Sequence, residues 1–285
     1  MLAVIEYDDA QDPRAGRDVT ITYVGNDRGF AQAYLNVNAF PEAAHASVHA
    51  AASRFAMFHY QLKLLHVFLD ESKERFVQHI REPKFELANL LSGDTRDRFV
   101  AKFDGIEVLT ALNGLFYVLK SFFDVYAQLL CSLIAPHQSM SFKRRNIGTT
   151  NLSGGTFIRW LRTSCPASFA NREGLASFIE SESRQWITEA VAHRDTLGHY
   201  SDIEDVHALQ VPLNRLAHPD DPMYEPASLQ SPRMPSGELV EIYALGTGDK
   251  LRQFVISTLG MFPELKHHLL RFPAFDINQE LWSDK

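Results

Sequence analysis

Two short segments near the start of the chain alternate hydrophobic and polar residues, which is the period of a β-strand. They are Leu2–Tyr7 and Val19–Val24, and the connection between them, DDAQDPRAG, is rich in residues that favour turns. The pattern therefore predicts a β-hairpin within residues 1–40.

From Pro41 onward, hydrophobic residues recur mainly at the spacing of one helix face. The helices expected from this spacing, from proline stops and from capping residues are Pro41 to about His79, Ser92 or Asp94 to Ile134, about Thr156–Thr163 and about Glu173–Leu197. Gly105 and Gly114 weaken the second helix, and Gly198 stands where a C-cap glycine belongs after the last one.

After Tyr200 the pattern becomes mixed, with two expected strands, Ala208–Leu213 and Leu239–Leu245, and a final helix from Lys250 to about Met261. We therefore expect a mainly α fold: a helical bundle with small β elements contributed by the N- and C-terminal segments. The expected anatomy is one domain over residues 1–285. It comprises a β-hairpin appendage (1–40), a helical core (41–200), and a β-hairpin with a terminal helix (201–285).

Composition adds limits on the class of protein. The most apolar stretch, Leu112–Ile134, contains Lys120 and Asp124, each of which would cost roughly 2.5–3.5 kcal/mol at a bilayer centre. We therefore expect a core helix rather than a membrane span, and no membrane partner. The chain has only 2 Cys and no basic region before Asp8, so neither a disulfide framework nor a signal peptide is expected, and a cytoplasmic location is the default.

One segment, ITEAVAHRDTLGHYSD, brings together residues suited to phosphodiester chemistry at the end of a predicted helix. His199 can exchange a proton near neutral pH, and Arg194 can hold a phosphate and stabilise charge that develops on it. On an ideal helix, residues five apart are separated by about 140°. A left-handed Gly198 would instead let His199 return toward Arg194. The alternative is structural: His199 caps the helix and Arg194 pairs with Asp195 or a nearby glutamate.

The hexapeptide RDTLGH, Arg194 to His199, resembles the signature of HEPN domains: an Arg, usually a polar neighbour, and a His a few residues on. These domains are small helical bundles in which long helices precede the motif-bearing one, as Phe116–Ile134 precedes Trp186–His199 here. The resemblance covers roughly residues 106–200.

The resemblance implies a metal-independent endoribonuclease, often a homodimer in which two motifs face each other. His199 would then be the general acid/base, Arg194 the phosphate clamp and Asp195 an orienting group. Members of the family serve in toxin–antitoxin systems, phage defence and RNA processing, so RNA and an antitoxin are the implied partners. Other members have lost catalysis and bind ligands or proteins, and a non-catalytic binding or interaction module is the alternative for this chain.

Two further features bear on that site. Asp124 lies among aromatic residues, so it needs a partner if it is buried, and Arg194 is the candidate; alternatively, Asp124 reaches solvent. Although the chain has a net charge of -7, residues 141–194 hold eight basic residues against four acidic ones, a net of about +4. Their KRR run, Lys143, Arg144 and Arg145, is the expected RNA-binding segment, or else a solvated loop without a partner.

The remaining candidate chemistry is weaker. His45 and His49 are four apart, as two zinc ligands on a helix would be, but no third ligand stands at an obvious spacing. Cys131 and Cys165 lack a basic cluster with a histidine, so both are expected to be structural. We therefore expect neither a metal site nor a cofactor.

Overall fold

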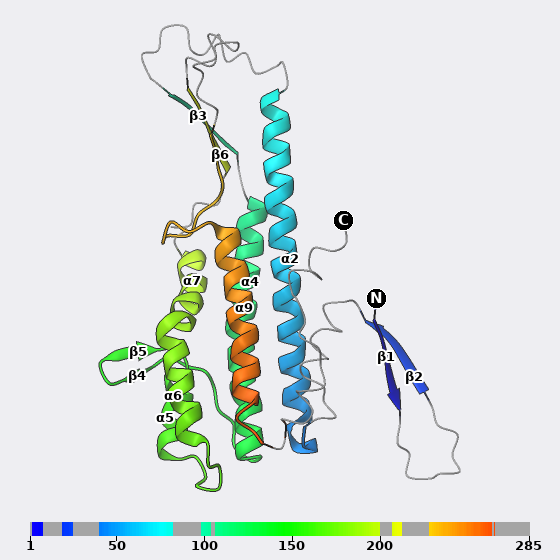
Figure 1. The fold of residues 1–285 in the computed structure, drawn as a ribbon, viewed down its shortest axis with the longest axis vertical. Coiled ribbons are helices and arrows are strands. Elements are labelled where there is room, and N and C mark those ends of the chain that lie inside the picture. The colour runs from blue at the N-terminus through cyan, green and yellow to red at the C-terminus, as the bar shows by residue number, and fades with distance from the viewer. Residues whose placement is uncertain are drawn as a thin grey trace. The chain divides into compact units, whose positions relative to one another are not determined.

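The computed structural model describes residues 2–7, 19–24, 40–81, 98–103, 106–199, 207–212, 228–263 and 265 (Figure 1). Its strands are β1 (Leu2–Tyr7), β2 (Val19–Val24), β3 (Arg98–Phe103), β4 (Arg145–Ile147), β5 (Thr150–Leu152), β6 (His207–Pro212) and β7 (Ser228–Gln230). Its helices are α2 (His45–Arg81), α4 (Ile106–Ile134), α5 (Gly155–Thr163), α6 (Arg172–Glu182), α7 (Thr188–His199) and α9 (Val240–Leu259). A 3-10 turn (Glu42–Ala44) precedes α2, and a π-helical turn (Ser183–Ile187) joins α6 to α7. The described chain is thus mainly α with small β elements, as the sequence predicts.

The chain divides into two compact units. Unit 1 comprises Met1–Tyr60, Phe116–His193 and Asp249–Lys285, and unit 2 comprises Gln61–Leu115 and Arg194–Gly248. Helices α2, α4, α7 and α9 contribute residues to both. The prediction that the whole chain forms one domain stays a prediction.

Aromatic side chains form the centre of unit 1. The ring of Phe122 stacks on that of Tyr126, with centroids 5.1 Å apart, and Phe123 packs edge-on against Phe254 at 5.5 Å. The Tyr126 hydroxyl lies 2.6 Å from Thr258 Oγ1, which gives the buried phenol a polar partner. These contacts hold α4 against α9, and burial raises the pKa of Tyr126.

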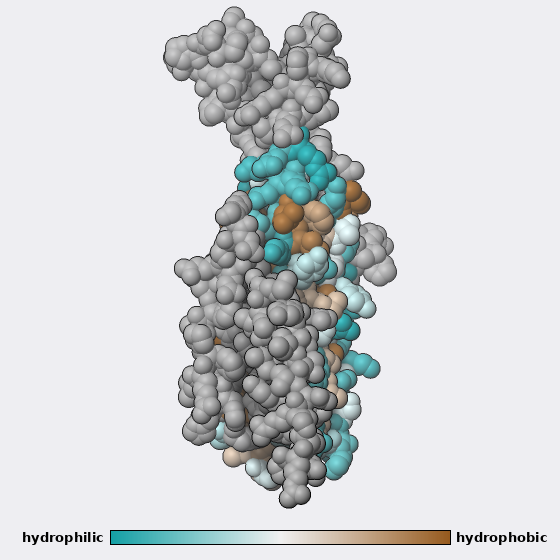
Figure 2. Space-filling view, turned by 90° about the vertical axis from the view of Figure 1, so that its right-hand side faces the viewer, coloured by the Kyte–Doolittle hydropathy of each residue, from teal (hydrophilic) through white to brown (hydrophobic). Residues whose placement is uncertain are grey.

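Helix α4 supplies many of the buried side chains because its apolar positions recur at helical spacing on a wide face. Among the described residues it is the helix long and apolar enough to cross a membrane, and half of its most apolar window is buried inside the structure. A core helix has the same property. On the face shown in Figure 2, small hydrophobic areas lie among hydrophilic ones.

Unit 2 combines a small sheet with the remaining parts of the long helices. Strand β6 lies between β3 and β7, antiparallel to both. His66 on α2 joins α9, since its Nδ1 lies 2.8 Å from Glu241 Oε1. Gly114 on α4 faces Gln61 on α2, and the amide oxygen of the Gln61 side chain lies within 2.6 Å of where a Cβ would be.

The structure confirms several predicted elements and corrects two. The antiparallel pairing of β1 with β2 confirms the N-terminal hairpin, and α2 and α5 confirm two predicted helices. Residues 98–103, predicted as part of a helix, form β3, because Phe99, Ala101 and Phe103 alternate and pair with β6. The predicted caps Ser92 and Asp94 lie outside the described residues.

The second correction concerns the predicted strand Leu239–Leu245, which is the first part of α9. The run LVEIYAL alternates well enough for a strand. The residues that become buried are Val240, Ala244, Thr247 and Leu251, whose spacing of four, three and four is helical. The predicted helix from Lys250 is therefore the second half of a longer one.

Candidate functional site

The motif segment lies on an unbroken helix. α7 runs through Gly198 to His199, so the predicted helix end at Gly198 is wrong. The chain does not turn back there, and the backbone positions of Arg194 and His199 remain about 140° apart around the helix. Asp195 and His199 are four apart, which places these two positions on the same helix face.

Packing within unit 1 fixes the helical turn just before the motif. His193 is buried, and its ring centroid lies 5.3 Å from that of Phe116 on α4. Burial lowers the pKa of His193, and Glu189, whose Oε1 lies 3.8 Å from the imidazole Nε2, partly opposes this shift. Arg194 follows directly and is half-buried, while the side chains of Asp195 and His199 lie outside the described residues.

Asp124 binds groups other than the predicted Arg194. Its Oδ2 accepts a hydrogen bond from Lys120 Nζ at 2.9 Å, and its Oδ1 accepts one from the backbone N–H of Phe142 at 3.2 Å. The carboxylate thus fixes the segment that follows α4. The predicted pairing with Arg194 is not among the bonds that Asp124 makes in the described structure.

The basic KRR segment leads into a hairpin that the sequence pattern does not predict. Lys143 and Arg145 are exposed, and Arg145 begins β4, which pairs antiparallel with β5 around Gly148 at φ 62°. Arg144 has a structural use as well, since its guanidinium donates to Ser153 Oγ at 3.4 Å and to the Thr188 carbonyl at 3.2 Å. All three predicted RNA-binding residues are exposed, and the side chains of Lys143 and Arg145 make no hydrogen bond or ion pair in the described structure.

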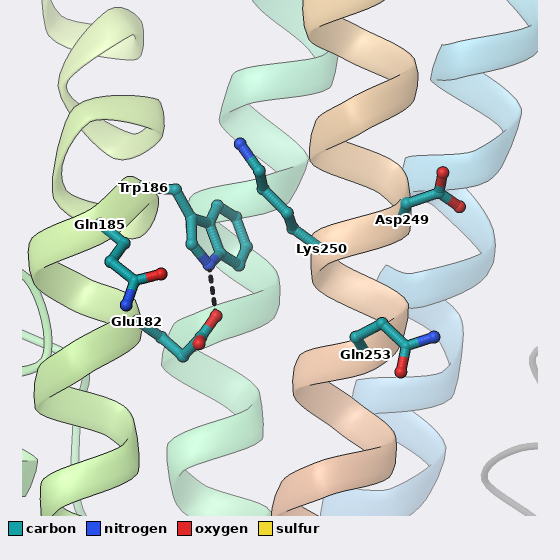
Figure 3. Close-up of a pocket in the computed structure, with 6 residues that line it drawn as sticks. All are labelled: Glu182, Gln185, Trp186, Asp249, Lys250 and Gln253. Carbon is teal, nitrogen blue, oxygen red and sulfur yellow. Dashed lines mark hydrogen bonds between the residues drawn. The ribbon is translucent and has the colours of Figure 1, made fainter.

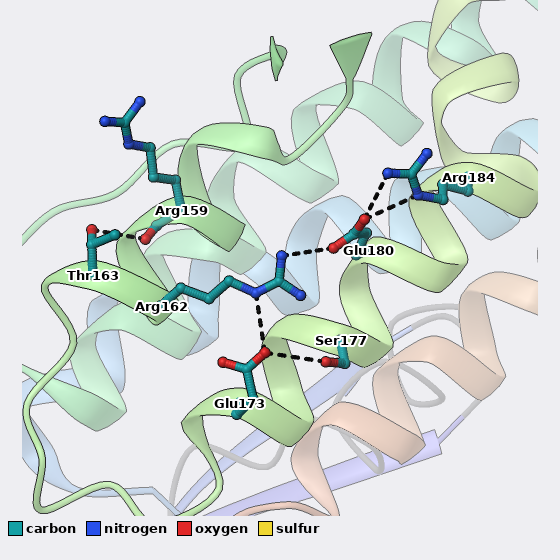
Figure 4. A network of polar contacts seen from close by, with 7 residues as sticks. All are labelled: Arg159, Arg162, Thr163, Glu173, Ser177, Glu180 and Arg184. Atoms are coloured by element: carbon teal, nitrogen blue, oxygen red, sulfur yellow. Dashed lines mark hydrogen bonds and ion pairs between the residues drawn. The ribbon is translucent and has the colours of Figure 1, made fainter. Parts of the chain in front are cut away.

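Four other charged residues on α5, α6 and the π-helical turn form an arginine–glutamate network (Figure 4). Arg162 donates to Glu173 Oε1 at 3.1 Å and to Glu180 Oε2 at 2.8 Å. Arg184 donates to Glu180 Oε1 at 2.7 Å. These bonds, above all the one from Arg184, lower the pKa of Glu180. Arg159 points away from the network in the same view.

A cleft of about 390 Å³ lies between α9 and the junction of α6 with the π-helical turn (Figure 3). It is lined by Glu182, Gln185, Trp186, Asp249, Lys250 and Gln253. Lys250 reaches toward Trp186, and the indole Nε1 donates to Glu182 Oε2 at 2.6 Å. Sequence reasoning missed this cleft because its two walls are more than sixty residues apart in the chain, and because nothing in the helical spacing indicates a π-helical turn.

Neither histidine of the predicted pair forms part of a metal site in the described structure. His45 Nε2 lies 2.9 Å from the Phe40 carbonyl, and His49 is exposed. Among the described residues, no group of three or more His, Cys, Asp or Glu side chains could hold a metal ion. Both cysteines are buried, and burial raises the pKa of the Cys131 thiol to about 11, which fits its predicted structural role.

Comparisons of the chain with protein-family models, with curated proteins and with solved structures found no match.

Proposed function

We propose that this protein is a metal-independent endoribonuclease whose site combines Arg194 of one copy with His199 of a second copy. The observation that carries the proposal is the position of both residues on one unbroken helix, α7, which packs against the long apolar helix α4. This arrangement resembles that of HEPN domains.

The second copy follows from helix geometry. Two positions about 140° apart on one helix direct their side chains to different sides, which disfavours contact of both with the same phosphate. Two copies related by a two-fold axis can present the arginine of one chain beside the histidine of the other. The homodimer expected from the resemblance thus has a geometric reason in this chain.

In the proposed reaction, His199 accepts the proton of a ribose 2′-hydroxyl as its oxygen attacks the neighbouring phosphorus. The protonated imidazole then returns that proton to the departing 5′ oxygen, leaving a 2′,3′-cyclic phosphate and a 5′-hydroxyl. Arg194 stabilises the charge that develops on the non-bridging oxygens. Asp195, one turn before His199 on the same face, can orient the imidazole.

RNA cleavage in EDTA tests this proposal. Wild-type protein should cleave, while Arg194→Ala and His199→Ala should lose cleavage and keep their circular dichroism spectra. His49→Ala and Arg172→Ala are matched controls, because both remove an exposed side chain of the same type from other helices. Cleavage by the His199→Ala variant at the wild-type rate would contradict the proposal.

The cleft favours a second candidate function, a non-catalytic module that binds a small polar ligand. Its lining offers an ammonium group, carboxylates, amides and an indole, and π-helical turns are frequent at functional sites. Titration with nucleoside monophosphates should then change the tryptophan fluorescence of wild type through Trp186. The same titration should leave the fluorescence of the Trp186→Phe variant unchanged. A protein that shows this response and never cleaves RNA would be the binding module.

A further inference from the structure

A long stretch of unit 1 carries positive charge without any acidic residue. Residues 125–172 contain no Asp or Glu, although the chain as a whole has 35. The basic residues of this stretch are Lys143, Arg144, Arg145, Arg159, Arg162 and Arg172. Such a concentration in a chain of net charge -7 produces a local field that attracts polyanions.

Four of these six residues, Lys143, Arg145, Arg159 and Arg172, make no side-chain hydrogen bond or ion pair within the described part of the chain. Arg172 begins α6, whereas the other three lie beside or on the β4–β5 hairpin and on α5, and we call these three the unpaired cations: Lys143, Arg145 and Arg159. All three are exposed, and within the described part of the chain none has a carboxylate partner. Figure 4 shows the difference on α5, since the exposed Arg159 points away from the arginine–glutamate network that Arg162 joins. The unpaired cations therefore gain no ion pair within the described part of the chain.

The hairpin that carries Arg145 is anchored at its first strand. The backbone N–H of Thr156, in the first turn of α5, donates to the Lys143 carbonyl at 3.2 Å. Gly155 lies so close to the Arg145 carbonyl that a Cβ would overlap it, so glycine is required there. The strand β4 is therefore fixed on the start of α5, the helix that carries Arg159.

The second strand is anchored to the π-helical turn and α7. Arg184 donates to Thr150 Oγ1 at 3.0 Å, and the backbone N–H of Ser153 donates to Thr188 Oγ1 at 3.1 Å. A two-stranded hairpin of polar residues is marginal on its own, and these bonds hold it projecting from the helices (Figure 1). A rigid projection presents its cations at fixed spacing.

The side chains exposed on the β4–β5 hairpin and the start of α5 favour double-helical RNA over single-stranded RNA. The other exposed hairpin residues are Asn146, Thr149, Thr150 and Asn151, which can hydrogen-bond to phosphates and 2′-hydroxyls. The nearby aromatic rings of Phe142, Phe157 and Trp160 are buried. Proteins that bind single strands commonly stack bases on exposed aromatic rings, whereas double-helical RNA is held through its backbone.

We propose that the β4–β5 hairpin and α5 bind the backbone of double-helical RNA through Lys143, Arg145 and Arg159. This inference rests on the proposed function for its choice of RNA, and it narrows the substrate class to RNA with a base-paired segment.

Binding of a fluorescent RNA duplex by the full-length chain tests the proposal, with His199→Ala as the background so that no RNA is consumed. Three neutralised phosphates predict about a 40-fold loss of affinity between 50 and 200 mM salt. Each of Lys143→Gln, Arg145→Gln and Arg159→Gln should lower the slope of log affinity against log salt by about 1. Arg172→Gln is the matched control, because it removes an equal exposed charge at the start of α6, away from the hairpin.

The proposal is overturned if the three variants keep the wild-type slope of log affinity against log salt. It is also overturned if Arg172→Gln lowers that slope as much as they do. Equal affinity for the single strand of the same sequence, or for a DNA duplex, would also overturn it. This binding result is independent of turnover. If wild type never cleaves RNA, the proposed function is contradicted. The duplex-binding site is then still tested separately, by the salt dependence of RNA binding in the three variants.

Discussion

Two sets of cations lie close together in unit 1, and they serve different ends. Arg162 pairs with Glu173 and shares Glu180 with Arg184, so two carboxylates neutralise these two cations within the protein. The unpaired cations on the hairpin and α5 carry charge of the same sign without any such neutralisation in the described structure. The comparison teaches that two uses of positive charge can be distinguished by ion pairing. A cation paired with a carboxylate of the same protein contributes to stability, whereas a cation without such a pair is available to a partner.

The largest expected effect comes from truncating Phe142, the buried residue that holds the segment carrying the unpaired cations against α4. Phe142 is buried, stacks on Phe123 with centroids 4.9 Å apart, and immediately precedes Lys143. Phe142→Ala should lower the free energy of unfolding by about 3 kcal/mol, as measured with urea. It should also weaken duplex RNA binding although every cation remains. Undiminished binding would show that Phe142 does not position the cations; Phe142→Leu, which keeps most of the apolar volume, is the control.

A smaller effect is expected at the centre of the arginine–glutamate network. Glu180→Gln should lower the free energy of unfolding by about 1 kcal/mol at pH 7, because two ion pairs are lost. The folded-state pKa of Glu180 is lowered from 4.5, so its contribution is full above that pH and is lost as the pH falls through the folded value. Urea unfolding at pH 7 and pH 3 should therefore show a difference from wild type that shrinks in acid. A difference that is constant with pH would contradict the ion-pair explanation.

The smallest effect compares two arginines of the same helix. Arg162→Gln should cost about 0.5–1 kcal/mol of stability, whereas Arg159→Gln should stay within about 0.5 kcal/mol of wild type. Thermal unfolding of the two variants side by side measures the difference. Equal destabilisation by both would remove the distinction between paired and unpaired cations.

Much of the fold is predictable from the sequence because it depends on local spacing. The apolar stripe of α2 and the alternation in β1 and β2 each predict the observed element. Where prediction is wrong, partners distant in sequence decide the outcome. β3 forms because β6, more than a hundred residues later, pairs with it.

For the candidate site, too, one part can be predicted from the sequence and another part cannot. The residue types of Arg194 and His199 and the basic run can be read from the sequence, but their geometry cannot. Gly198 is compatible with a helix end and with a helix interior, and it is the observed continuation of α7 that separates the two positions. The hairpin is held by bonds between residues distant in sequence, such as Arg184 to Thr150, which no local pattern encodes. The cleft likewise brings together residues of α6, the π-helical turn and α9.

The central claim is that two copies complete one catalytic site, and mixing two inactive variants tests it most directly. Arg194→Ala and His199→Ala should each be inactive alone. After subunit exchange, half of the dimers are mixed and one of their two sites is complete, so about a quarter of wild-type cleavage should return. If exchange is verified and wild type cleaves, a mixture that stays inactive would contradict the claim and place both residues in a site within one chain.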